Sequence, residues 1–276
     1  MSNLKTFLKN CKYCVGFLLC SFITNTYAQT DWVNYLAEKE KGLMSIYVDL
    51  YFNNKKPNYK NLLIIGSTYK DCFNNGFPKN EGLDQLYSVS DATAAEINQL
   101  TDNKLVGVIT YQCVGYDVYY VKDTIDLRSN VLKVLNDNFS NSKHYVVIRK
   151  DRTWEYYFDY LYPDNVSDEF FTDHQYLNEL ALKGDDLSEE RAVNHYFYFK
   201  SIKNRVDFIN KIKVLDYAID SVSYKKEAAY PYELQVSKKE FIDPESVKAS
   251  TTLLKLMSEG SKGLYQGWAT EVQIDD

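Results

Sequence analysis

The sequence predicts an α+β protein made of two consecutive domains, each with an antiparallel sheet packed by helices. Segments rich in β-branched and aromatic residues alternate with segments of helical periodicity. The order β-α-β-β-α-β occurs once in each half of the chain, which is the ferredoxin-like, or split βαβ, arrangement. We therefore expect one ferredoxin-like domain over residues 31–148 and a second over residues 149–276.

Length and composition support a folded protein with two domains. The 276 residues are typical of two domains of ordinary size, and the 45% hydrophobic and 25% charged residues are typical of a globular chain. The net charge of -6 argues against nonspecific nucleic-acid binding, which usually needs a basic surface. The 25 tyrosines suit half-buried sheets, because each has an apolar ring and a polar tip.

The first 28 residues have the features of a secretory signal peptide. Three lysines within residues 5–12 precede a short apolar run at 14–23, and a small-x-small pattern ends at Ala28. We expect cleavage after Ala28 and export to the periplasm or the exterior. The alternative is a lipoprotein acylated at Cys20, but the small residues usually found before a lipidated cysteine are absent. No later segment is expected to span a membrane.

Cleavage would leave two of the five cysteines in the mature chain, Cys72 and Cys113. An oxidising compartment favours a disulfide between them. The alternative is a pair of buried free thiols, since cysteine often serves as a small core residue. Both interpretations remain open from the sequence.

In the first domain, apolar patterning and breaker residues define the elements. A Gly at position 115 marks a predicted hairpin turn, and Asn80 is a plausible cap for the first long helix. The helices are expected at 81–100 and 126–139. The strands are expected at 32–36, 45–52, 61–68, 104–113, 116–121 and 144–149.

In the second domain, the same reasoning gives strands that alternate with helices. Gly184 is well placed to stop the helix that begins near Asp168, and a proline begins the helix over 244–259. A further helix is expected at 201–212. The strands are expected at 154–163, 191–200, 217–224, 232–236 and 265–274.

Four features of the first domain occur together: Trp32, the strand over 45–50, the Gly-Phe-Pro at 76–78 before a helix, and the Val-Gly-Val-Ile-Thr hairpin strand. With these features, the domain resembles the family of unknown function numbered six-nine-five. The resemblance covers roughly residues 31–148. The family has no established activity, so the resemblance implies no chemistry.

In the second domain a charged turn leads into an Arg-x-x-x-His strand, and a Gly-Trp pair follows near the end of the chain. With these motifs, the domain resembles the regulator of ribonuclease E activity B family (RraB) over roughly residues 149–276. The resemblance implies a non-catalytic regulator that binds a protein, and export implies a partner other than a cytoplasmic ribonuclease. The candidate motif residues are Gly184, Asp185, Asp186, Arg191, His195, Gly267 and Trp268.

The sequence also contains residues that could support chemistry, and each has a simpler interpretation. His174 and His195 lack the ligand spacing of a zinc site. Cys113 with His144 could form a nucleophile and base, but no orienting residue is indicated. The acidic cluster at 185–190 lacks EF-hand spacing, and a solvated capping turn is the simpler interpretation.

We therefore expect a non-catalytic binding or regulatory module with no cofactor, no metal and an unknown protein partner in the cell envelope. The alternative is a cell-envelope hydrolase or a metal-dependent enzyme. Clustering of His174 and His195 with two acids in one pocket would favour the enzyme, and dispersal would favour the module. We further expect His195 and Trp268 to anchor the second domain, on a sheet face shared with Trp154 and Tyr156.

Overall fold

The computed structural model describes residues 31–274, and the chain from Asp31 onward forms one compact unit. The predicted signal peptide, its cleavage site and Cys20 lie outside the described residues. None of the described helices combines the length and the apolar character needed to cross a membrane.

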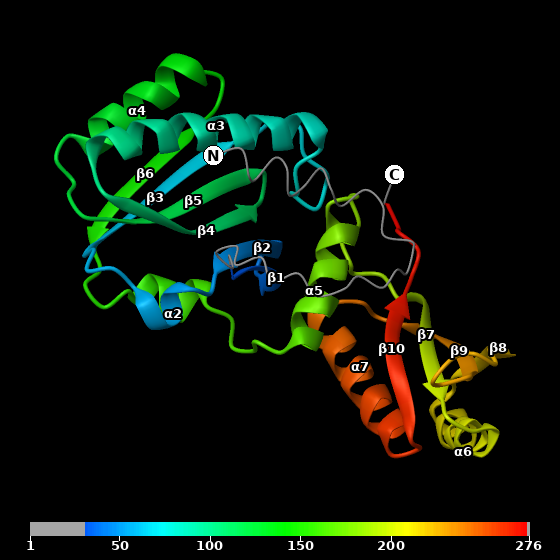
Figure 1. The fold of residues 1–276 in the computed structure, drawn as a ribbon. Helices are drawn as coiled ribbons and strands as arrows, with labels where there is room; N and C mark the ends of the chain where they lie inside the picture. The colour runs from blue at the N-terminus through cyan, green and yellow to red at the C-terminus, as the bar shows by residue number, and fades with distance from the viewer. Residues whose placement is uncertain (1–30, 275–276) are drawn as a thin grey trace. The chain divides into compact units, whose positions relative to one another are not determined.

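The first half contains a six-stranded antiparallel sheet in the order β1-β2-β4-β5-β3-β6. Its last four strands have ferredoxin-like order, because β5 lies between β3 and β4 and β6 flanks β3 (Figure 1). The β1-β2 hairpin extends this sheet at one edge. The strands are β1 (Trp32–Lys39), β2 (Gly42–Asp49), β3 (Asn61–Thr68), β4 (Asn103–Tyr111), β5 (Val114–Val121) and β6 (His144–Lys150).

Helices cover both faces of this sheet (Figure 1). Helices α3 (Asn80–Leu100) and α4 (Leu127–Asn138) bury one apolar stripe each against one face, and their buried side chains include Ile97 and Val131. The short helix α2 (Phe52–Lys55) and the π-helix η2 (Tyr156–Leu161) pack on the other face. The side chains packed between the sheet and the helices are apolar on each face, so the alternating side chains of the central strands are buried on both sides.

The structure places a π-helix at Tyr156–Leu161 in the segment predicted as a strand over 154–163, so that prediction is wrong. Trp154, Tyr157 and Leu161 are buried at a spacing that fits one side of a helix, and the Trp154 ring stacks on Tyr120 with centroids 3.8 Å apart. The Asp151 carboxylate accepts hydrogen bonds from the backbone N–H groups at the start of this helix, at 2.9 and 3.0 Å. A polar cap and a helically spaced aromatic stripe therefore override the β-favouring composition.

The β4-β5 turn lies at Gln112 and Cys113, so the prediction that Gly115 marks it is wrong. Both turn residues have positive φ, 51° and 58°, as a tight hairpin turn requires. Gly115 lies inside β5, where a Cβ would meet Leu86 Cδ2 at 2.4 Å. The glycine is therefore needed for the close approach of a helical side chain, not for the turn.

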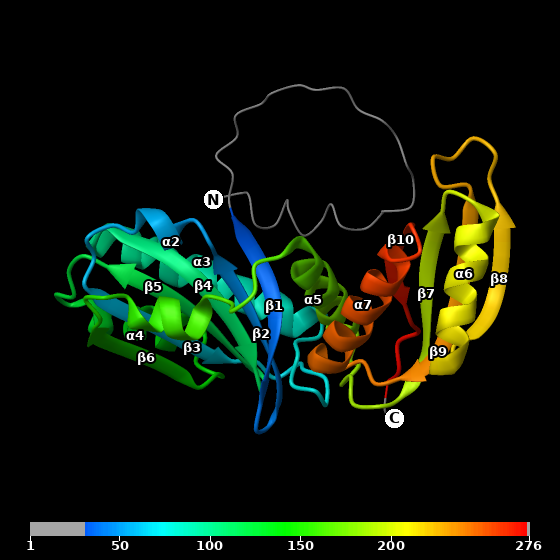
Figure 2. The same ribbon diagram turned by 90° about the horizontal axis from the view of Figure 1, so that it is seen from below.

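The second half contains a four-stranded antiparallel sheet in the order β10-β7-β9-β8, which is again ferredoxin-like. Helices α6 (Ile202–Ile212) and α7 (Pro244–Glu259) lie on the same face of this sheet (Figure 2). Helix α5 (Asp168–Ala181) precedes the sheet, and a short 3-10 turn η3 (Lys213–Leu215) follows α6. The strands are β7 (Arg191–Phe199), β8 (Ala218–Tyr224), β9 (Tyr232–Glu240) and β10 (Gly263–Ala269).

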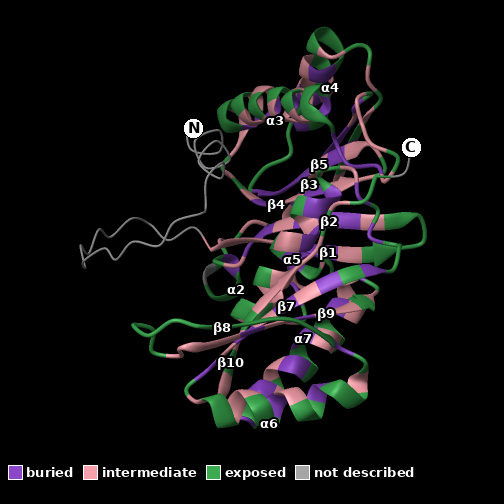
Figure 3. Cartoon of the chain, turned by 90° about the vertical axis from the view of Figure 1, so that its right-hand side faces the viewer, coloured by how far each residue is buried: buried purple, intermediate pink, exposed green. Residues whose placement is uncertain are grey.

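Burial differs sharply between an inner strand of this sheet and the edge strand β8 (Figure 3). Strand β7 alternates strictly, with every second residue buried from Arg191 to Phe199. Every residue of the edge strand β8 is exposed. Strand β10 ends at Ala269, earlier than the predicted 274, because the chain then leaves the sheet to contact the turn before β7.

Candidate functional site

The turn between α5 and β7 holds the first group of motif residues. Gly184 has a φ of +96°, and a Cβ at this position would lie 2.7 Å from the Phe73 ring. Both the backbone conformation and the aromatic neighbour therefore require glycine here. The turn packs closely against the loop that follows β3.

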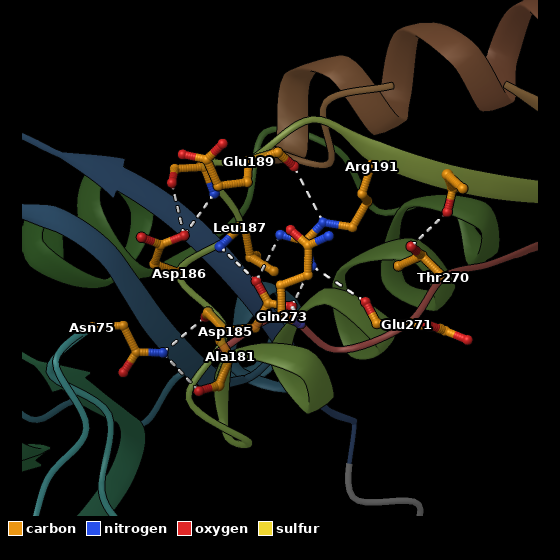
Figure 4. A network of polar contacts seen from close by, with 12 residues as sticks. Asn75, Ala181, Asp185, Asp186, Leu187, Glu189, Arg191, Thr270, Glu271 and Gln273 are labelled. Carbon is orange, nitrogen blue, oxygen red and sulfur yellow. Dashed lines mark hydrogen bonds and ion pairs between the residues drawn. The ribbon is translucent and has the colours of Figure 1, made fainter. Parts of the chain in front are cut away.

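Asp185 and Arg191 form a buried ion pair at the centre of this turn (Figure 4). The guanidinium contacts both carboxylate oxygens, with 3.0 Å between Nη2 and Oδ1. The same carboxylate accepts hydrogen bonds from the backbone N–H groups of Leu187, at 3.0 Å, and Gln273, at 2.9 Å. The side chains are 0% and 2% exposed, so Asp185 is not part of a solvated turn as predicted. Asp186 is exposed, as expected.

Arg191 also ties the turn to the chain that follows β10. Its Nε donates to the Glu189 carbonyl at 3.2 Å, and Nη1 donates to the Glu271 carbonyl at 3.3 Å. A planar guanidinium can satisfy several acceptors at once, which suits it to this buried junction. The Asp185–Arg191 ion pair thus holds together the turn, the start of β7 and the segment after β10.

Asn75 joins this turn to the first half of the chain (Figure 4). Its Nδ2 donates to the carbonyls of Ala181 and Asp185, both at 2.8 Å. Its Oδ1 accepts from the Phe77 backbone N–H at 2.9 Å. A cavity of about 280 Å³ lies beside these contacts, with Phe73 and Asp186 in its lining.

The loop that carries Asn75 is fixed by Cys72 and Cys113. Their sulfur atoms are bonded in the structure and their Cα atoms lie 5.9 Å apart, inside the roughly 7 Å that bridging requires. The Cys113 backbone N–H donates to the Gly76 carbonyl at 2.9 Å, and the Tyr69 hydroxyl donates to the same carbonyl at 2.7 Å. The disulfide therefore links the β4-β5 turn to the loop that contacts Gly184.

His195 lies at the centre of a second, separate network. Its side chain is buried, with Nδ1 2.9 Å from the Tyr265 hydroxyl and Nε2 2.7 Å from Glu240 Oε2. The Tyr217 hydroxyl donates to Glu240 Oε1 at 2.6 Å. Burial would raise the pKa of Glu240, but the hydrogen bonds from His195 and Tyr217 outweigh it and hold the pKa below its usual value.

The two tyrosines of this network are poor nucleophiles. Burial, together with the adjacent Glu240 carboxylate, raises the pKa of Tyr217 far above its usual value. Burial also raises the pKa of Tyr265, with the negative charges of Asp173 and Glu240 adding to the effect. Both hydroxyls therefore remain protonated and act as hydrogen-bonding groups.

Trp268 pairs with His195 across the β10-β7 ladder, and its partly buried ring packs against the core that includes Leu177 and Val193. The indole Nε1 donates to Asp173 Oδ1 at 2.8 Å, and the Thr251 hydroxyl donates to Oδ2 at 3.0 Å. Burial raises the pKa of Asp173. Gly267 has a φ of +126° at the register shift beside Tyr265, so glycine is needed there for backbone conformation.

The prediction that all the anchoring residues lie on one sheet face is wrong in part. Trp268 and His195 are neighbours, but Trp154 and Tyr156 pack against the first sheet. The reason is that Trp154 and the π-helix at Tyr156–Leu161 pack on that sheet instead of forming a strand of the second one. His174 also belongs elsewhere, since its Nδ1 accepts from the Leu36 backbone N–H at 3.0 Å.

His174 is held as a neutral acceptor. Burial, followed by the charge of Lys248, lowers its pKa to about 4. Within the described residues, no group of three or more His, Cys, Asp or Glu side chains is arranged to hold a metal ion. His144 Nε2 lies 2.9 Å from the Phe139 carbonyl, and Cys113 is bonded to Cys72, so they do not form a nucleophile and base.

The motif residues therefore form two groups. Gly184, Asp185 and Arg191 build the turn, whereas His195, Gly267 and Trp268 belong to the β7-β10 network. The partners that complete these groups were not predicted: Asn75, Asp173, Glu240 and Tyr265 come from distant positions in the sequence. Their residue types alone carried no signal for such pairings.

Comparison with known proteins gives two family matches, one in each half of the chain. Residues 30–162 match the model of a family of unknown function, DUF695. Residues 172–270 match the model of the regulator of ribonuclease activity B family, RraB, and this range includes all seven motif residues. No curated protein matches the chain.

Two solved structures show weak likeness to the chain. One is a candidate glycine cleavage system transcriptional repressor, at 6% identity over 78% of this chain and 100% of that chain, with a TM-score of 0.24. The other is an unknown protein from Galdieria sulphuraria, at 10% identity over 78% and 99%, with a TM-score of 0.20. The family matches are the informative result: the N-terminal half resembles DUF695 and the C-terminal half resembles RraB.

Proposed function

We propose that this is an exported, non-catalytic protein that binds and regulates another protein through the free edge of its C-terminal sheet. The observation that carries the proposal is the edge strand β8, in which all seven residues are exposed. An edge strand presents unpaired backbone N–H and C=O groups, to which an extended segment of a partner can add as a further strand.

The geometry of β8 defines where a partner would pair. A register shift between Ile219 and Ser221 interrupts the ladder with β9, so the regular part of the edge is Ser221–Tyr224. Val222 and Tyr224 lie opposite Leu234 and Tyr232 and are 52% and 57% exposed. Helix α6 packs on β7 and β9, and these apolar side chains of β8 remain more than half exposed. They would supply side-chain contacts beside the backbone pairing.

The internal contacts of the motif residues support a role without catalysis. The Asp185 carboxylate and the Arg191 guanidinium satisfy each other, and both ring nitrogens of His195 have partners inside the fold. His174 bonds to the backbone of β1, away from His195. This dispersal favours a binding module over a cell-envelope hydrolase or metal-dependent enzyme.

The similarity to RraB supports regulation through a protein contact, and the signal-like first 28 residues support export. An exported chain meets the proteins of the envelope, so its partner differs from a cytoplasmic ribonuclease. N-terminal sequencing of the protein from its host tests the export step. A sequence that begins at Gln29 is expected, a lipidated Cys20 would indicate the lipoprotein route, and an intact Met1 would refute export.

Site-specific photo-crosslinking in the producing cell tests the binding surface. A photoreactive residue at Ser221 is expected to give a discrete adduct with one protein, and the added substitution Val222→Lys should abolish it. The matched control places the photoreactive residue at Ser129, which is exposed on α4 in the other half. Equal adducts from both positions, or an adduct that survives Val222→Lys, would refute the proposal.

A further inference from the structure

We propose that a basic depression at the ends of β3, β5 and β6 is a binding site for a small molecule that carries a tetrahedral oxyanion, either phosphate or sulfate. The depression has a volume of about 300 Å³. Its lining consists of Asn58, Lys60, Asn61, Lys122, Lys150 and Arg152. This site lies in the first half of the chain, on elements that the proposed protein contact does not use.

Strand pairing brings these residues together. Asn61 at the start of β3 pairs with Val121 at the end of β5 on one side and with Lys150 at the end of β6 on the other. The Asn61 side chain donates to the carbonyls of Val121 and Lys122, at 3.3 and 3.0 Å. The Asp151 backbone N–H donates to the Lys60 carbonyl at 2.9 Å. The backbone framework of the depression is therefore fixed by the sheet.

The charge balance of the depression favours an anion. Four of the six lining side chains are cationic and none is a carboxylate, although the chain as a whole carries a net charge of -6. Lys122 pairs with Asp102 at 3.0 Å. Within residues 31–274, the side chains of Lys60, Lys150 and Arg152 form no ion pair or hydrogen bond. Their mutual repulsion would be relieved by a bound anion.

The nearest buried acid is turned away from this charge. The Asp151 carboxylate accepts from the Tyr120 hydroxyl at 2.6 Å and from two backbone N–H groups of the following helix. It is 7% exposed and belongs to the core on that side of the sheet. Asp151 therefore stabilises the helix and leaves the neighbouring cations of the depression available to a ligand.

The residue types and the volume indicate the class of ligand. An arginine fork and lysine ammonium groups bind oxyanions through charge-assisted hydrogen bonds, and the Asn58 amide can add a neutral donor. A volume of about 300 Å³ is at the lower end for small-molecule sites. The absence of aromatic and aliphatic side chains from the lining favours a compact charged group over a large apolar body.

Two tryptophan indoles allow binding to be located by NMR. Trp154 Nε1 donates to the carbonyl of Tyr59, which lies between the lining residues Asn58 and Lys60 in the chain. Trp268 Nε1 donates to Asp173 in the other half. Pyrophosphate titrated into the ¹⁵N-labelled protein, isolated from its host, should shift the Trp154 indole resonance saturably and leave that of Trp268 unchanged. Inorganic phosphate and sulfate, titrated separately at equal ionic strength, distinguish the two oxyanion sources.

Charge-removing variants test whether the depression carries the affinity. The double substitution Lys150→Gln with Arg152→Gln should weaken pyrophosphate binding at least ~10-fold, and added sodium chloride should weaken it in the parent protein. The matched control is Lys203→Gln with Lys213→Gln, at exposed positions in the other half. Unchanged affinity in the first variant, an equal loss in the control, or a Trp268 shift without a Trp154 shift would overturn the proposal.

Discussion

Replacement of Asp185 by Asn tests the structural role of the α5-β7 turn. The substitution keeps the shape of the side chain but leaves the Arg191 guanidinium, 2% exposed, without a buried counter-charge. The substitution removes the charge from both Arg191 contacts and replaces one acceptor oxygen with an NH2 group. The hydrogen bonds from the Leu187 and Gln273 backbones, one to each carboxylate oxygen, can then no longer both form. Removal of one partner of a buried pair typically costs roughly 3–5 kcal/mol, so we expect a loss of about 4 kcal/mol.

Urea unfolding of the parent protein and of Asp185→Asn, followed by tryptophan fluorescence, measures this loss. The midpoint should fall while the denaturant slope stays unchanged. The control is Asp137→Asn, which breaks the exposed Lys133–Asp137 pair and should cost at most about 0.5 kcal/mol. A loss below about 1 kcal/mol for Asp185→Asn would refute the assigned role. The pair Asp185→Leu with Arg191→Met should recover part of the stability, because it leaves no uncompensated charge.

Three further predictions concern other parts of the fold. Trp268→Ala should lower the free energy of unfolding by about 3 kcal/mol, and His195→Ala should lower the thermal midpoint. If both variants melt like the parent, these residues form a binding surface instead of a structural anchor. Burial raises the pKa of Asp117 from 3.8 to about 6, so its stabilising effect is complete below pH 3.8 and is lost as pH rises through 6. The free energy of unfolding of Asp117→Asn, measured by urea titration, should therefore rise by roughly 2–3 kcal/mol relative to that of the parent between pH 4 and pH 8. A difference between the two proteins that does not change with pH would contradict this. Reduction of the Cys72–Cys113 disulfide, which spans 41 residues, should lower the unfolding free energy by about 4 kcal/mol; an unchanged midpoint in reductant would argue against the bond.

Hydrophobic periodicity was sufficient to predict most elements. The strand at Asn61–Thr68 and the helix at Pro244–Glu259 have their predicted bounds, because each has a clear apolar pattern between breaker residues. The ferredoxin-like order followed from the element sequence in both halves. The division of the chain at residues 148 and 149 remains a prediction.

Aromatic composition was ambiguous where tertiary contacts decide the structure. The run from Trp154 to Leu161 has the residue types of a strand, yet its buried positions and the Asp151 cap favour a helix. A local pattern does not reveal that cap, because the same carboxylate also bonds to Tyr120 in another strand. Likewise, Gly115 is required by Leu86, which lies in a helix packed over the strand.

The sequence analysis identified the motif residues of the candidate site but not the residues that they contact. Asp185 belongs to an acidic cluster that is otherwise exposed, and only the fold shows that Arg191 and the backbone of residue 273 bury it. Asn75 is 110 residues away from the carbonyl that it contacts. Single polar residues at such separations leave no periodic signal, so these partners become visible only in the folded chain.

Amide hydrogen exchange of the partner complex, isolated through the Ser221 adduct or by affinity, shows whether β8 makes the contact. In the free protein the outward amides of β8 have no strand partner among residues 31–274 and should exchange rapidly. In the complex, we expect strong protection at residues 221–224 and little change elsewhere. Unchanged exchange at β8, with protection instead around Phe73 and Asp186 at the cavity beside the α5-β7 turn, would contradict this expectation.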